Sequence, residues 1–182
     1  LDPLLLYLLG GTIVGARLGH IFFYHPVYYL THPVEIIKVW EGGLASHGGA
    51  IGILIALYLF SRSRSDQPYL WLLDRLSIPV ALTGSFIRIG NVFNSEILGT
   101  EAEVPWAFVF TRIDQVPRHP VQLYESGTYL LIFIGLLVYY RRYGPDVRRG
   151  MLTGLFFLTI FGSRFFLEYF KMRQAAFGEG LP

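Results

Sequence analysis

The stretch LWLLDRLSIPVALTGSFIRIGNVFNSE, residues 70–96, is long and mostly apolar, and it carries an arginine near its far end. The hydrocarbon core of a bilayer is about 30 Å thick, which takes roughly 20 apolar residues to cross as an α-helix. We therefore predict a membrane-spanning helix over 70–93. A charged side chain inside such a span costs about 2.5 kcal/mol or more, so Arg88 is a candidate for function.

Four other segments have the same apolar character: 4–24, 44–60, 121–140 and 151–170. The composition agrees, because 53% of the 182 residues are hydrophobic, only 15% are charged and the mean hydropathy is +0.45. A soluble domain is about 25% charged. The sequence therefore predicts an all-α, polytopic membrane helix bundle with about five transmembrane helices, which we treat as a single transmembrane domain over 1–182.

The loops predict the orientation of the bundle. The connections between the second and third spans and between the fourth and fifth are short and rich in arginine: Arg62, Arg64, Arg141, Arg142, Arg148 and Arg149. Positive loops favour the cytoplasmic side of a membrane. The loop 94–120 then belongs to a loop and short-helix region on the opposite side. With alternating spans, four polar motifs at helix ends also lie on that side, and we predict that they form one site.

The first motif is GGLASHGG, residues 42–49, in which two glycine pairs flank His47. Glycine lets a backbone or a ligand approach closely because it has no Cβ, and small residues also permit tight helix packing in membranes. A packing stripe with a structural histidine is one interpretation. The other makes His47 a general base or a hydrogen-bond donor, since histidine titrates near neutral pH.

The second motif surrounds Arg88. If this stretch is helical, Arg88 and Asn91 share one face, and a guanidinium beside an amide suits a phosphate group because arginine offers a planar fork of donors. The alternative is that Arg88 reaches to the membrane interface or pairs with Glu96.

The third motif is HPVQLYE, residues 119–125. Gln122 and Glu125 are three apart and share a helix face. Glu125 lies a few residues inside a predicted span, so we expect it to pair with a cation from another helix. That pairing would also be compatible with a purely structural role.

Arg164 and Glu168 form the fourth motif, four residues apart. One interpretation is an intrahelical ion pair, although arginine before the acid is the less favourable order. In the other, Glu168 holds Arg164 toward the bundle centre, where Arg88 and Arg164 clamp one anionic group. Arg17 is a further cation in the same half of the membrane, whereas Lys171 counts only as a charge of the tail.

Several function classes fit the sequence poorly. The chain has no cysteine, so any thiol chemistry would use a thiol of the substrate. The net charge of +2 and the absence of basic runs interleaved with aromatics argue against nucleic acid. The histidines lack ligand spacing, so we expect no metal site. A transporter would more often show broken helices and a repeat at the midplane, whereas charges at one end of the spans suit an anionic lipid headgroup.

These motifs resemble those of the prolipoprotein diacylglyceryl transferase family of bacterial inner membranes. The matching positions are Arg17–Gly19, Phe23, Tyr24, Gly42, Gly43, His47–Gly49, Arg88–Asn91, Asn94, Glu96, Gly99, His119, Pro120, Gln122–Glu125, Arg164, Phe165 and Glu168. The likeness runs nearly end to end. Ile87 and Ser95 stand where the family usually has glycine, and the tyrosine that the family places before its last arginine is not apparent. The family layout implies a further span before Leu1 and another after Pro182.

The resemblance implies an alkyl transfer without a cofactor. The diacylglyceryl unit of phosphatidylglycerol would move to the thiol of the lipobox cysteine of a prolipoprotein that still carries its signal peptide. A thioether would form and glycerol phosphate would leave. The resemblance also implies a multi-pass protein in the lipid of the bacterial inner membrane, with its active site toward the periplasmic face.

We hypothesise that His47 takes the proton of the thiol, while Arg88 and Arg164 compensate charge on the phosphate. The resemblance implies phosphatidylglycerol binding by Arg88, Asn91, Asn94, Glu96, Gly99, Arg164 and Glu168. Supporting positions are Arg17, His119, Gln122, Tyr124 and Glu125. A non-catalytic phospholipid-binding relative is the first alternative, because two glycines are replaced and one tyrosine is absent. A small transporter is the second.

Overall fold

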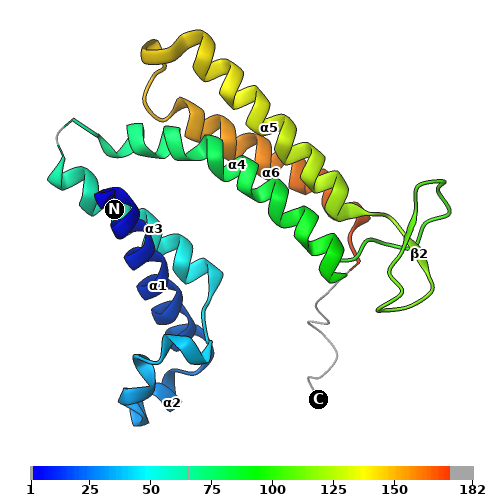
Figure 1. The fold of residues 1–182 in the computed structure, drawn as a ribbon, viewed down its shortest axis with the longest axis horizontal. Helices are drawn as coiled ribbons and strands as arrows, with labels where there is room; N and C mark the ends of the chain where they lie inside the picture. Colours follow the sequence, from blue (N-terminus) through cyan, green and yellow to red (C-terminus); the bar gives the residue numbers. More distant parts are fainter. Residues whose placement is uncertain (1, 65, 173–182) are drawn as a thin grey trace. The chain divides into compact units, whose positions relative to one another are not determined.

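The computed structural model describes residues 2–64 and 66–172, and most of them are helical. The chain divides into two compact units, Leu1–Leu73 and Asp74–Pro182, which are coloured blue to cyan and green to red in Figure 1. The single transmembrane domain over 1–182 stays a prediction.

The first unit is built on two helices, α1 (Pro3–Tyr24) and α3 (Ser46–Ser63). Between them lie α2 (Pro26–Thr31) and the 3-10 turns η1 (Pro33–Ile36) and η2 (Val39–Glu41). The helices α1 and α3 touch through glycines: a Cβ on Gly52 would collide with the carbonyl oxygen of Gly11, and one on Gly19 would lie 2.7 Å from Cα of Gly48. Gly48 is therefore a packing position, as one interpretation of the glycine motif predicts.

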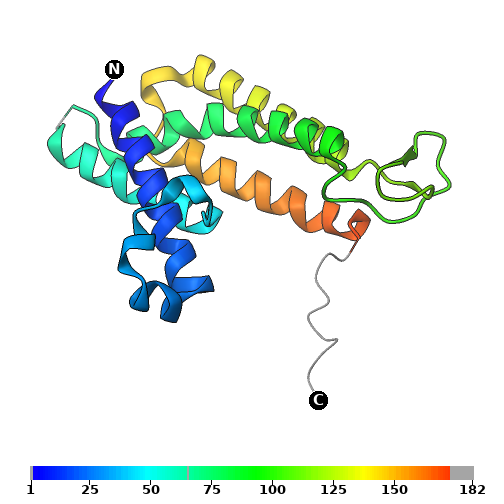
Figure 2. The same ribbon diagram turned by 60° about the horizontal axis from the view of Figure 1, so that its bottom comes forward.

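The second unit consists mainly of three helices that run side by side (Figures 1 and 2): α4 (Tyr69–Asn94) from Asp74 onward, α5 (Val121–Tyr143) and α6 (Met151–Leu167). The turns η3 (Gly144–Asp146) and η4 (Glu168–Phe170) precede and follow α6. The buried carboxylate of Asp74 on α4 accepts hydrogen bonds from the backbone N–H groups of Gly150, at 2.6 Å, and Thr153, at 2.9 Å. The carboxylate from α4 thus accepts hydrogen bonds from N–H groups at the start of α6 that have no acceptor within their own helix.

The loop between α4 and α5 contains a small antiparallel hairpin of β1 (Phe108–Val109) and β2 (Pro117–Arg118). The chain after α6 pairs with the start of this loop: the N–H of Thr100 donates to the carbonyl of Phe170 at 2.8 Å, and the N–H of Met172 to that of Leu98 at 3.0 Å. These contacts tie the ends of α4, α5 and α6 together. The strands were not predicted, because two residues are too few to show an alternating pattern. The short helices α2, η1 and η2 lie between the first two predicted spans, at 26–41, and not in the loop 94–120.

By length and composition four helical segments of the described residues could cross a membrane: Pro3–Tyr24, Tyr69–Asn94, Val121–Tyr143 and Met151–Phe170. They coincide with four of the five predicted spans. The predicted span 44–60 is helical from Ser46 to Ser63, but polar residues occupy both of its ends. Its apolar part, 48–60, would be about 20 Å long, which is shorter than the bilayer core. A crossing at α3 therefore stays a prediction.

Candidate functional site

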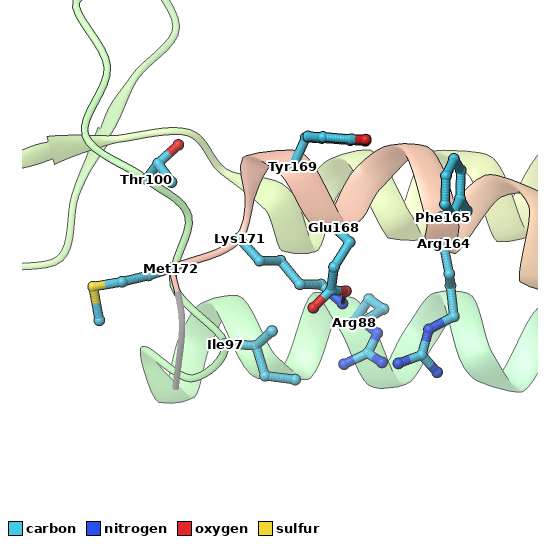
Figure 3. A pocket seen from close by; sticks show the side chains of 9 residues that line it. All are labelled: Arg88, Ile97, Thr100, Arg164, Phe165, Glu168, Tyr169, Lys171 and Met172. Carbon is cyan, nitrogen blue, oxygen red and sulfur yellow. Dashed lines mark ion pairs between the residues drawn. The ribbon is translucent and has the colours of Figure 1, made fainter. Parts of the chain in front are cut away.

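A cleft of about 960 Å³ lies in the second unit, where α4 and the end of α6 face the loop that follows α4 (Figure 3). Its lining residues are Arg88, Ile97, Thr100, Arg164, Phe165, Glu168, Tyr169, Lys171 and Met172. Figure 3 shows the guanidinium groups of Arg88, from α4, and Arg164, from α6, extending into the same space. Two of the predicted arginines therefore face one cleft, together with a third cation, Lys171.

Arg88 is held in place by two side chains. Its Nε lies 2.9 Å from Oε2 of Glu125, and its Nη1 donates to Oδ1 of Asn91 at 3.1 Å. Asn91 in turn donates through Nδ2 to Oε2 of Glu96 at 2.7 Å. The alternative of an Arg88–Glu96 ion pair is therefore wrong in its direct form, because Asn91 stands between the two. A guanidinium fixed from two sides is preorganised for an anion.

Glu125 on α5 is the buried centre of the charge network. Its side chain is 0% exposed, with Oε2 paired to Arg88 and Oε1 lying 2.9 Å from Nζ of Lys171. A buried carboxylate of this kind is tolerated only when cations compensate it. The predicted pairing of Glu125 with a cation from another helix is confirmed. Lys171 as a partner was missed, because it follows the apolar end of its helix and looks like a tail charge.

Arg164 and Glu168 do not pair with each other. Glu168 instead lies 3.3 Å from Lys171, through Oε2 and Nζ. Over 2–64 and 66–172 no carboxylate lies within 4.0 Å of the Arg164 side chain in an ion pair. Both predicted roles of Glu168 toward Arg164, as an intrahelical partner and as a holder, are therefore wrong. Arg164 is thus a cation of the cleft without a carboxylate partner in the described part of the chain.

A strained turn follows α4 beside the cleft. Ser95 and Ile97 have φ angles of 56° and 55°, in the left-handed region that disfavours side chains with a Cβ and β-branched ones most of all. Between them, the N–H of Glu96 donates to the carbonyl of Asn91 at 2.9 Å, and Nε2 of Gln122 donates to the carbonyl of Glu96 at 2.7 Å. These bonds hold the turn. The turn lies beside the candidate cleft, and strained backbone is often found at functional sites.

The other motif residues of this unit surround the cleft without lining it. Asn94 is exposed at the end of α4, and Gly99 is buried where a Cβ would lie 2.8 Å from Val121. Nδ1 of His119 shares a hydrogen bond of 3.1 Å with the hydroxyl of Tyr124, which also accepts from Nε1 of Trp106 at 2.7 Å. These hydrogen bonds hold His119, Tyr124 and Trp106 together, and a supporting role at the site for His119 and Tyr124 stays a prediction. For Gly99 the contacts indicate packing rather than headgroup binding.

The hairpin is fastened by a pair that sequence reasoning missed. Nη2 of the buried Arg118 lies 2.6 Å from Oδ2 of Asp114, and Nη1 contacts the Sδ atom of Met172 at 3.4 Å. The hydrogen bond from Arg118 holds the pKa of the Asp114 carboxyl below its usual value. Because Met172 lines the cleft, this pair connects the hairpin to the cleft wall.

Arg17 belongs to the first unit and is 5% exposed. Its Nε donates to the carbonyl of Ile36 at 3.0 Å and its Nη1 to that of Gly42 at 2.6 Å, while Nη2 donates to the carbonyl of Glu35. The guanidinium therefore organises the loop 25–45. Backbone carbonyls therefore occupy the donors of Arg17, and its supporting role at the site stays a prediction.

His47 also lies in the first unit, exposed in the first turn of α3. Its ring is 5.0 Å from that of Phe23 and 6.2 Å from that of Tyr24. The imidazole is thus exposed and lies against two aromatic rings. Its action together with Arg88 stays a prediction.

Known proteins resemble this chain over its whole length. A family model described as prolipoprotein diacylglyceryl transferase matches residues 1–181. Relatives named phosphatidylglycerol–prolipoprotein diacylglyceryl transferase include that of Chloroherpeton thalassium, 55% identical over 100% of this chain and 68% of the relative. That of Tolumonas auensis is 54% identical over 99% and 69%, and that of Porphyromonas gingivalis is 45% identical over 95% and 65%. The chain spans about two thirds of the length of these relatives.

Proposed function

This chain belongs to the prolipoprotein diacylglyceryl transferase family, and on that premise we propose that it is a multi-pass membrane transferase that moves the diacylglyceryl group of phosphatidylglycerol to a prolipoprotein. The observation that carries the proposal for the site is the cleft lined by Arg88, Arg164 and Lys171. Three cations beside apolar helices suit a lipid phosphate better than an uncharged substrate.

The reaction makes a specific electrostatic demand. In our proposal the thiol sulfur of the lipobox cysteine attacks the diacylglyceryl carbon that bears the phosphate ester. A carbon–sulfur bond forms, the carbon–oxygen bond breaks, and its electrons stay on the phosphate oxygen. The phosphate changes from a diester with one negative charge to a monoester that carries about −1.5 to −2. Cations that are already in place stabilise this developing charge without reorganising.

We assign the charge compensation to Arg88 and Arg164. Arg88 is fixed by Glu125 and Asn91, so its guanidinium is oriented before the lipid arrives. Arg164 has no carboxylate partner among the described residues, so a ligand does not have to displace one. Glu96 acts through Asn91, which it holds toward Arg88.

The remaining parts of the proposal concern the acceptor and the membrane. His47 takes the proton of the lipobox thiol, for which an exposed imidazole is suited. The protein lies in the bacterial inner membrane, with the cleft toward the periplasmic face, because the arginine-rich connections favour the cytoplasmic side.

An assay with purified full-length protein, phosphatidylglycerol in detergent micelles and a lipobox peptide tests the proposal, with the thioether product detected by mass. We expect Arg88→Lys and Arg164→Lys each to lower the rate by about 100-fold or more, because an ammonium lacks the bidentate fork. Arg141→Lys, an exposed position at the other end of α5, is the matched control. Near wild-type rates for the Arg88 and Arg164 variants would refute the assignment, and lipid binding without thioether would favour a non-catalytic protein.

A further inference from the structure

Lys171 lies in the cleft between two carboxylates that differ greatly in exposure. Its Nζ is 2.9 Å from Glu125, whose side chain is 0% exposed, and 3.3 Å from Glu168, whose side chain is 66% exposed. The lysine side chain itself is 11% exposed. One partner is thus sealed in the protein, and the other faces the space of the cleft.

The backbone around Lys171 is fixed. The residues on both sides of it, Phe170 and Met172, hydrogen-bond to Thr100 and Leu98 in the loop after α4, and the N–H of Lys171 donates to the carbonyl of Glu168 at 3.1 Å. Figure 3 shows the lysine side chain directed toward Glu168 and Arg88. The ammonium is therefore a positioned charge rather than part of a free tail.

The charges of the cleft suit a phosphodiester better than a phosphomonoester. Arg88, Arg164 and Lys171 are positive, while Glu168 at the cleft and Glu125 beneath it are negative, so one net positive charge remains. A phosphodiester carries one negative charge, which this excess balances. The glycerol phosphate that leaves carries close to two. One further positive charge has to become available during the reaction.

We propose that Lys171 is a third phosphate cation and that Glu168 is its exchangeable counter-ion; the proposal rests on the proposed function. Lys171 cannot leave Glu125, because an unpaired buried carboxylate is strongly unfavourable. It can leave Glu168, because an exposed ion pair is weak and the carboxylate can turn to water. As the carbon–oxygen bond breaks, Lys171 binds the phosphate oxygen that keeps the electrons, and Glu168 reclaims Lys171 when glycerol phosphate leaves.

In this scheme Lys171 is a catalytic residue and Glu168 is a positioning residue that acts through it. Removing the negative charge of Glu168 leaves Lys171 permanently available, so the product binds more tightly and leaves more slowly. Removing the charge of Lys171 weakens product binding and slows bond cleavage. Arginine at position 171 keeps the charge and should keep product binding.

Calorimetric binding of glycerol phosphate to the full-length protein in detergent at low salt tests the proposal. We expect Glu168→Gln to lower the dissociation constant by about tenfold and to reduce kcat without raising KM, because product release becomes slower. Lys171→Gln should raise the dissociation constant by about tenfold or more, with Lys171→Arg within about threefold of wild type. Glu103→Gln, an exposed acid of the loop that does not line the cleft, controls for net charge.

Unchanged product affinity in Glu168→Gln overturns the proposal, even if Lys171→Gln fails to fold because Glu125 has lost a partner. Binding that depends on total charge, with Glu103→Gln equal to Glu168→Gln, overturns it as well. Absence of peptide transfer by the wild-type protein would instead contradict the proposed function. The binding measurements therefore test the roles of Lys171 and Glu168, and the transfer assay separately tests the proposed function.

Discussion

Ser95 occupies a position where left-handed backbone favours glycine, with φ of 56°. A residue with a Cβ costs roughly 1–2 kcal/mol in this conformation. Ser95→Gly should therefore raise the free energy of unfolding by about 0.5–1 kcal/mol, since glycine also gains freedom in the unfolded chain. Thermal unfolding in detergent measures the change, with Ser95→Ala as the control that keeps the Cβ. A loss of stability in Ser95→Gly would show that the serine side chain holds the turn.

The Asp114–Arg118 pair predicts a dependence of stability on pH. The hydrogen bond from Arg118 lowers the folded-state pKa of Asp114 below its usual 3.8. The ionised Asp114 carboxyl therefore contributes to stability above pH 3.8. This contribution is lost as the pH falls through the pKa of Asp114 in the folded state, which lies below 3.8. Unfolding midpoints of wild type and Asp114→Asn, compared from pH 7 down to pH 3, should differ at neutral pH, and the difference should shrink as the pH falls below 3.8. A constant difference would contradict the linkage.

At the residue scale the sequence predicts which charges need an explanation but not which atoms satisfy them. The cost of a charge within a span singles out Arg17, Arg88 and Arg164 alike. Backbone carbonyls satisfy Arg17, and Glu125 and Asn91 satisfy Arg88. Among the described residues Arg164 has no carboxylate partner. Lys171 lies past the apolar end of its span, so hydropathy gives it no weight.

Among the helices, the packing of α1 against α3 depends on glycine at particular positions. Gly52→Ala should lower the free energy of unfolding by about 1–3 kcal/mol, because the new methyl group would strike the backbone of Gly11. Gly10→Ala is the matched control, since a Cβ at Gly10 meets no atom within 4 Å. It should leave stability unchanged or raise it by up to about 1 kcal/mol. Unfolding in denaturing detergent compares the two, and equal effects would contradict this account of the interface.

The start of α6 depends on a carboxylate from α4. Asp74→Asn replaces one acceptor oxygen by an amide donor that faces N–H groups of Gly150 or Thr153, so we expect a loss of about 1–3 kcal/mol. Asp146→Asn, at an exposed position of the preceding turn, is the control. Unfolding followed by circular dichroism in detergent measures both. Equal stability of the Asp74 variant and wild type would mean that water satisfies these N–H groups.

Helices were predictable because apolar length is a strong signal, whereas the connections were not. The predicted start of the fourth span at 121 coincides with that of α5. The hairpin of β1 and β2 and the pairing of 98–100 with 170–172 depend on contacts between distant segments, which periodicity does not record. The same is true of the close contact between α1 and α3, where the glycine spacing only permitted it.

For the molecule as a whole, the absence of cysteine makes the predicted orientation directly testable. Single-cysteine variants at Thr111, in the loop with the hairpin, and at Asp146, in the connection before α6, occupy exposed positions. A membrane-impermeant maleimide should label Thr111→Cys in intact spheroplasts and Asp146→Cys only after permeabilisation. The reverse pattern would contradict the orientation, and labelling of both in intact spheroplasts would contradict the number of spans between them.

The pairing of 170–172 with 98–100 limits how far the chain can be shortened at the end of α6. A gene cut after Leu167 would still encode every arginine that hydropathy selects, together with all of α4, α5 and α6. Its product would lack Lys171, so Arg88 would be the one ion-pair partner of Glu125 left among the described residues. Leu98 and Thr100 would also lose their backbone hydrogen bonds to Met172 and Phe170. The residues after α6 therefore hold one wall of the cleft together, and we expect a shortened chain to need them.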